Sequence, residues 1–326
     1  MNSPADLSLD RRSLLAIVAA LAAAGVPSPG VATPAPVRLL LIHGRSQQGH
    51  DPADLKKAWL AALRRGAQAA GVTLPEDVDV AFPFYGDVLD KFARAYDIPL
   101  ASDIKAKGNA DTDEYLAFQA EIAEALRQRA GVTDAQIDAE YGPNPRAKGP
   151  LNWDWVQAIL RALDKNGGGL GQQALAMFTR DVFLYTTRDG VRDEIDDIVA
   201  GSLTVNPTVI VAHSLGSVVA YNVLRTDKRD LKVPLLVTVG CPLGIRAIRR
   251  QYQPLRFPKN VGGWYNAYDR RDVVALYALD RENFPVPPPP EIVNYALVDN
   301  HTDNRHGIDG YLDDPAVAKR VIGALA

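Results

Sequence analysis

The chain has 326 residues, of which 47% are hydrophobic and 23% are charged, and its formal net charge is −3. This balance is typical of a globular protein, and the length allows one large domain with an insertion or two small domains. Because the charge is so mild, it gives no electrostatic reason to expect nucleic acid, and we expect no nucleic-acid partner. Cys241 is the only cysteine, which excludes an internal disulfide; we expect it to be a small core residue.

Residues 1–36 have the pattern of an export signal and linker. The pair Arg11-Arg12 precedes an apolar stretch at 14–24, and glycine and proline residues then interrupt it. This pattern resembles a twin-arginine signal and predicts export to the periplasm or beyond the cell. The apolar stretch is shorter than the roughly 20 residues that a membrane span needs, so no stable span is expected. The alternative is a surface helix on a cytoplasmic protein.

The first strand is predicted at 37–42, where an almost continuous apolar run indicates burial on both faces. It leads directly into His43-Gly44-Arg45. An amphipathic pattern predicts a helix over 54–70, and a second strand is predicted at 78–82. Tyr85 follows that strand, at the edge of a parallel sheet where ligands bind, so it is a candidate pocket residue.

Between about 98 and 206 the strand pattern disappears, and apolar residues recur at helical spacing. A helical insertion of this size between two strands predicts a cap over a site at the edge of the sheet. The alternative is that these helices pack on the sheet as scaffold. The last of them, near 192–203, is expected to be the crossover into the next strand.

An apolar, β-branched run ends abruptly at Ser214, and a helical pattern of small residues begins directly after it. This is the sequence form of a nucleophile elbow, a tight strand-to-helix turn that exposes a serine hydroxyl. We expect the residues two before and two after the serine, Ala212 and Gly216, to be pressed together, so that only small side chains fit. The alternative is an ordinary helix N-capped by Ser214.

Further buried strands are predicted at 235–240, 264–268 and 292–298, and a terminal helix at 314–325. Strands that alternate with helices predict an α/β fold with a parallel, doubly wound sheet.

The segment Ala212-His213-Ser214-Leu215-Gly216 resembles the Gly-His-Ser-Leu-Gly elbow of many lipases. From about Val37 onward the chain resembles the α/β-hydrolase superfamily, within its serine esterases and lipases, although 98–206 lies outside the likeness. The resemblance implies one α/β-hydrolase domain at 37–326, a mostly parallel sheet, and a triad in the chain order serine, acid, histidine.

The resemblance places the base after the last strand, which leaves His306 and His301. His306 is preferred because a tyrosine follows it shortly, as in lipase-like hydrolases; His301 stays open. A metal site formed by both histidines with Asp299 and Asp303 is the other alternative, but their spacing matches no recognised metal motif, so no metal is expected.

For the acid, the segment after the strand at 264–268 offers Asp272 and Asp269. It resembles the lipase pattern of an Asn-containing strand leading to an aspartate, and that pattern falls on Asp272, with Asp269 as the alternative. The alternative for either aspartate is a structural role, in a turn or as a partner for the arginines beside it.

The resemblance implies a serine hydrolase that cleaves small-molecule carboxylic esters through an acyl-enzyme, without a cofactor. Ser214 would attack the carbonyl, and the N–H groups of Arg45 and Leu215 would form the oxyanion hole. A non-catalytic binding protein of the same fold stays open, as does an acyltransferase or thioesterase with the same triad.

Overall fold

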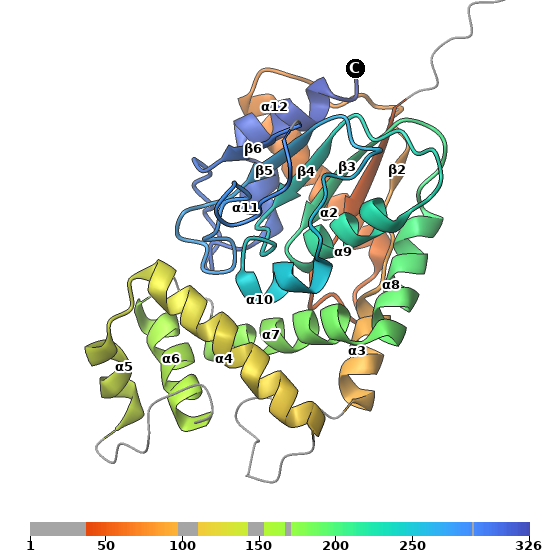
Figure 1. Ribbon diagram of the computed structural model, residues 1–326. Helices are drawn as coiled ribbons and strands as arrows, with labels where there is room; N and C mark the ends of the chain where they lie inside the picture. The colour runs from red at the N-terminus through yellow and green to blue at the C-terminus, as the bar shows by residue number, and fades with distance from the viewer. Residues whose placement is uncertain (1–36, 97–109, 143–152, 167–170, 289) are drawn as a thin grey trace, which may run out of the picture. The chain divides into compact units, whose positions relative to one another are not determined.

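The computed structural model describes residues 37–96, 110–142, 153–166, 171–288 and 290–326 (Figure 1). Residues Pro36–Ala326 form one compact unit. The export signal and linker predicted at 1–36 lie outside the described residues, and so do three pieces of the predicted cap, at 97–109, 143–152 and 167–170. The export signal therefore stays a prediction.

Within the described residues, six parallel strands form one open sheet in the order β2-β1-β3-β4-β5-β6. The strands are β1 (Arg38–Ile42), β2 (Val80–Ala81), β3 (Thr208–His213), β4 (Leu236–Val239), β5 (Trp264–Ala267) and β6 (Ile292–Tyr295). This confirms the α/β class and the parallel sheet. The strands predicted at 78–82 and 292–298 are shorter in the structure, since regular pairing with the neighbouring strand stops earlier than the apolar pattern.

Helices cover both faces of the sheet. The helices among the described residues, on these faces or beyond the edge of the sheet, are α2 (Pro52–Ala69), α3 (Gly86–Ala95), α4 (Ala110–Ala130), α5 (Asp134–Tyr141), α6 (Trp153–Asn166), α7 (Gln172–Thr187), α8 (Asp189–Gly201), α9 (Leu215–Thr226), α10 (Arg246–Arg249), α11 (Ile308–Leu312) and α12 (Pro315–Gly323), with a 3₁₀ turn at Arg250–Tyr252.

The apolar strand sequences follow from this two-sided cover. Successive side chains of a strand point to opposite faces, so a strand covered on both sides is mainly apolar on both of them. In β1, Leu39 and Leu41 join the core under α2 and α12, whereas Leu40 and Ile42 join the larger core that includes residues of α4 to α9. All four are fully buried.

The strand order reverses beside β1, because β2 lies on one side of it and β3 on the other. The carboxyl ends of β1 and β3 are direct neighbours, with Ile42 paired to Ala212. In open parallel sheets such a reversal leaves a crevice at the carboxyl edge, where ligands bind. His43-Gly44 and Ser214 both follow these two strand ends.

The helices between β2 and β3 contact segments that follow the carboxyl ends of strands. Tyr277 Oη, after β5, donates to the Ala125 carbonyl of α4 at 2.7 Å, and Arg129 Nε of α4 donates to the Leu276 carbonyl at 3.1 Å. Arg45, after β1, is ion-paired with Asp181 of α7. Figure 1 shows α4, α6 and α7 beyond the same edge of the sheet as α10.

Gly216 of α9 is the point of closest approach between the elbow and β1. A Cβ added to Gly216 would lie 2.4 Å from the carbonyl oxygen of His43 and 2.6 Å from that of Ile42. The end of β1 therefore leaves no room for a side chain at position 216, whereas the sequence led us to expect that Ala212 would impose this limit. Main-chain oxygens held in a strand and its loop cannot move aside as a flexible side chain can.

We expect Gly216→Ala to lower the free energy of unfolding by about 1–3 kcal/mol, because the added methyl group overpacks this contact. Gly190→Ala in α8 is the matched control: its added methyl group meets nothing within 4 Å. That change should raise the free energy of unfolding by about 0.5–1 kcal/mol, since alanine favours helix over glycine. Urea unfolding measures both. A stabilised Gly216→Ala protein would contradict the tight contact.

Candidate active site

Ser214 stands between the last residue of β3 and the first residue of α9, with φ 54° and ψ −126°. A positive φ is strained for a residue with a side chain, and such strain persists only where neighbouring contacts enforce it. Here the Ser214 N–H donates to the Val239 carbonyl at 3.0 Å, and Ser217 Oγ donates to the Ala212 carbonyl at 2.9 Å. These bonds hold the turn that directs the Ser214 hydroxyl to the carboxyl edge of the sheet.

The loop after β1 lies directly against this serine. A Cβ added to Gly44 would be 3.0 Å from Ser214 Cβ, so only a glycine lets the main chain come so close. The N–H of Arg45 follows in the chain. Leu215 is the first residue of α9, and its N–H therefore has no partner within the helix.

Three of the predicted site residues form a hydrogen-bonded chain. His306 Nε2 lies 2.8 Å from Ser214 Oγ, and His306 Nδ1 lies 2.7 Å from Asp272 Oδ2. Because a carboxylate only accepts, Nδ1 carries the ring proton and Nε2 is free to accept from the serine hydroxyl. Asp272 is fully buried and Ser214 is 1% exposed. The structure thus brings together a serine, an imidazole in the matching tautomer and a buried carboxylate.

Asp272 is held by two further donors. Tyr311 Oη donates to Asp272 Oδ2 at 2.5 Å, and the Val274 N–H donates to Oδ1 at 3.0 Å. Burial and the adjacent Asp272 carboxylate hold the pKa of Tyr311 well above its usual range, so the hydroxyl stays protonated and donates. Sequence analysis noted a tyrosine after His306 without assigning it this contact.

The alternative acid and base residues lie in other contacts. Asp269 Oδ2 accepts from the Asn300 N–H at 2.9 Å, and its Oδ1 accepts from the Arg271 N–H at 2.8 Å, so Asp269 organises the surrounding loops. His301 Nε2 lies 2.8 Å from Asp313 Oδ2, and its side chain is 61% exposed. Within the described part of the chain, neither Asp269 nor His301 is hydrogen-bonded to Ser214, and both have partners of their own.

His43 is locked into one tautomer by Tyr85. The Tyr85 N–H donates to His43 Nε2 at 3.1 Å, so His43 Nδ1 carries the proton and donates to the Gly44 carbonyl at 2.6 Å. Tyr85 Oη also donates to the His43 carbonyl. Tyr85 is completely buried. It therefore supports the loop after β1 instead of lining a pocket, and its role could not be read from sequence spacing.

His213, the residue before Ser214, holds the loop that carries His306. Its Nε2–H donates to the His306 carbonyl at 2.8 Å, and the two rings lie 4.9 Å apart. Burial holds the pKa of His213 well below its usual range, and the neighbouring His306 lowers it further. His213 is thus a neutral donor beside Ser214 and His306, a role that the sequence pattern around Ser214 did not reveal.

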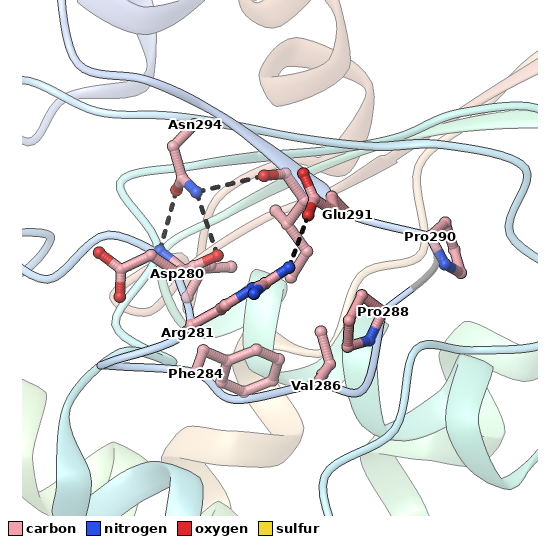
Figure 2. Close-up of a pocket in the computed structure, with 10 residues that line it drawn as sticks. Asp280, Arg281, Phe284, Val286, Pro288, Pro290, Glu291 and Asn294 are labelled. Atoms are coloured by element: carbon pink, nitrogen blue, oxygen red, sulfur yellow. Dashed lines mark hydrogen bonds and ion pairs between the residues drawn. The ribbon is translucent and has the colours of Figure 1, made fainter.

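A cavity of about 150 Å³ lies away from these residues, beside the start of β6 (Figure 2). Asn294 lines it and holds the main chain of Leu279, and an Arg281–Glu291 ion pair of 3.0 Å also lies in its lining. Because β6 is parallel to β3, its first residue, Ile292, lies at the edge of the sheet opposite to Ser214. This cavity and the candidate active site are separate.

No group of three or more histidine, cysteine or acidic side chains in the described ranges is arranged to hold a metal ion. Of the four residues in the metal alternative, His306 contacts Ser214 and Asp272, and His301 contacts Asp313. Cys241 is buried, and burial raises the pKa of its thiol to about 12. It is therefore a protonated core residue.

In the part of the chain that the structure describes, every helix is too short or too polar to cross a membrane. Comparison with protein-family models and with curated proteins finds no match for this chain.

We expect the stability of the protein to fall in mild acid because of His43. Burial lowers the pKa of His43 from 6.5 to about 4, so the unfolded chain takes up a proton more readily than the folded protein. The stabilisation, roughly 3 kcal/mol for a shift of this size, is present above about pH 6.5 and is lost as the pH falls to about 4.

Urea unfolding between pH 7 and pH 4.5 measures this effect. Glutamine has no proton to take up, so the stability difference between the wild type and His43→Gln should shrink as the pH falls. A difference that stays constant with pH would mean that His43 titrates normally in the folded protein.

Proposed function

We propose that the protein is a serine hydrolase of the α/β-hydrolase type that cleaves carboxylic esters through an acyl-enzyme intermediate. One observation carries the proposal: a strained serine at a strand-to-helix junction contacts His306 at 2.8 Å, which contacts the buried Asp272 at 2.7 Å. Serine, acid and histidine also follow one another in the chain order typical of that fold.

In the proposed reaction, Ser214 Oγ attacks the ester carbonyl while His306 Nε2 takes its proton. Asp272 keeps the imidazole oriented and stabilises the imidazolium, and Tyr311 keeps the carboxylate in place. The imidazolium then protonates the leaving alcohol. Water, deprotonated by His306, attacks the acyl-enzyme and releases the acid, which returns Ser214 to its hydroxyl form.

The N–H groups of Arg45 and Leu215 are the proposed oxyanion hole. The approach of Gly44 to Ser214 brings the Arg45 peptide beside the nucleophile, and Leu215 follows it directly. Losing one such donor typically costs about 3–4 kcal/mol of transition-state stabilisation. Side chains and main chain supply every group in this mechanism, so the proposal includes no cofactor.

We also propose that the helices between β2 and β3 cap the site. Their contacts to the segments after β1 and β5 support this, because both segments follow carboxyl ends of strands. A cap fits the low exposure of Ser214, since a covered site keeps bulk water from the reacting groups. The substrate would then enter between the cap and the sheet.

Hydrolysis of 4-nitrophenyl butyrate tests the proposal. Ser214→Ala and His306→Ala should each lower kcat by about 10⁴-fold or more, because either change removes the attacking group or its base. His301→Ala is the matched control, since His301 is exposed and paired with Asp313. It should keep kcat within about threefold of the wild type.

Thermal unfolding of each variant must accompany the kinetics, so that lost activity is not confused with lost structure. Wild-type activity in a folded Ser214→Ala protein would rule out the proposed nucleophile. If His301→Ala is inactive and His306→Ala is active, Ser214 keeps its role and the proposed base is wrong.

A further inference from the structure

Two arginines and one aspartate form a mostly buried charge cluster next to the candidate active site. Arg45 Nε lies 3.2 Å from Asp181 Oδ2, and Arg180 Nη2 lies 3.0 Å from Asp181 Oδ1. The side chains of the two arginines are 14% and 13% exposed, and that of Asp181 is 6% exposed. Each arginine thus uses a different oxygen of the same carboxylate.

The cluster carries one uncompensated positive charge, since two guanidinium groups and one carboxylate sum to +1. Among the described residues, Asp181 is the only acidic group that pairs with either arginine. A charge taken out of water without a partner is unfavourable, so buried ions are normally paired. The net positive charge of this cluster is therefore expected at a site where a ligand supplies the missing negative charge.

The guanidinium of Arg45 also has donors to spare. Its side chain donates through Nε to Asp181, and no described residue accepts from its Nη1 or Nη2. Arginine presents five N–H donors in a planar fork that matches the two oxygens of a carboxylate. An anion could therefore bind to Arg45 without displacing Asp181.

The cluster lies where a substrate would extend from Ser214. The main chain of Gly44 is in contact with Ser214, and Arg45 is the next residue. Arg180 and Asp181 belong to α7, one of the helices of the proposed cap. The cluster therefore joins the proposed oxyanion loop to the cap, between which the substrate would lie.

We propose that Arg45 and Arg180 bind a carboxylate carried by the ester substrate, away from the bond that is cleaved. This inference rests on the proposed function and names its substrate class. The substrate would be an ester of a dicarboxylic acid, or an ester whose alcohol carries a carboxylate. A carboxylate brings a charge of −1 and makes the cluster neutral. A phosphate carries about −1.5 to −2 at pH 7 and would leave the cluster negative.

Two matched pairs of esters test the proposal and identify the side that carries the charge. Mono-4-nitrophenyl adipate and 4-nitrophenyl hexanoate have the same leaving group and differ by a carboxylate at the far end of the acyl chain. The ester 4-acetoxybenzoate and its methyl ester differ in charge on the leaving group. The wild type should prefer the anion by about tenfold in kcat/KM in one pair.

Arg180→Gln should reduce that preference about tenfold, because it makes the cluster neutral while Arg45 keeps its partner Asp181. Arg94→Gln is the control variant: it removes the same charge from a side chain of α3 that is 79% exposed. Arg94→Gln should keep the preference for the anionic ester within about twofold of the wild-type value, since the charge of an exposed side chain is screened. A loss of preference in both variants would point to overall charge and overturn the subsite.

Binding to the Ser214→Ala protein separates this proposal from the proposed function. Calorimetry should show that the anion preferred in kinetics binds more tightly than its neutral partner, and that Arg180→Gln removes the difference. If wild type cleaves neutral esters through Ser214 without any preference for either anion, the subsite is wrong and the hydrolase stands. If both anions bind but no ester is cleaved, the hydrolase is wrong and the anion site stands. Equal binding of anions and neutral esters would overturn the subsite.

Discussion

The relative positions of Ser214 and the loop after β1 depend on one close contact, between the start of α9 and the end of β1. Gly216 packs its backbone against the carbonyls of Ile42 and His43, and Gly44 packs against Ser214. Because both contacts involve main chain, neither can adjust without moving a strand end. The contact therefore couples the serine to the loop that carries the Arg45 N–H, and it places the positive φ of Ser214 under the control of the sheet.

Around that contact, buried neutral groups surround the residues proposed to react. Burial lowers the pKa of both His43 and His213, so these two imidazoles are hydrogen-bonded supports without charge. His43 supports the loop after β1 through Gly44, and His213 supports the loop of His306. The loops that carry Arg45 and His306 are thus held by uncharged donors, whereas Asp272 and the arginine cluster place buried charge beside them.

Much of the sheet was predictable, because strands buried on two faces are mainly apolar, and β1, β3 and β4 contain apolar runs such as Leu39–Ile42 and Val209–Ala212. Strand ends such as Tyr295 were not, since they depend on where pairing with a neighbour stops. The elbow was visible because its constraint is local. Spacing alone left His306 and His301 open, and Asp272 and Asp269 as well, because loop conformation decides which side chain faces Ser214. Nothing local in the sequence indicated the contact of Arg45 with Asp181, which joins residues 136 positions apart.

The most direct test of the central claim is covalent labelling with a fluorophosphonate, which reacts with a serine that an adjacent base activates. Peptide mass spectrometry after reaction of the folded protein should locate one phosphonyl group per chain on Ser214, and heat-denatured protein should remain unlabelled. Labelling of Ser214 would show that the observed hydrogen bonds produce a nucleophile. Folded protein that stays unlabelled, or that is labelled at another residue, would contradict the account.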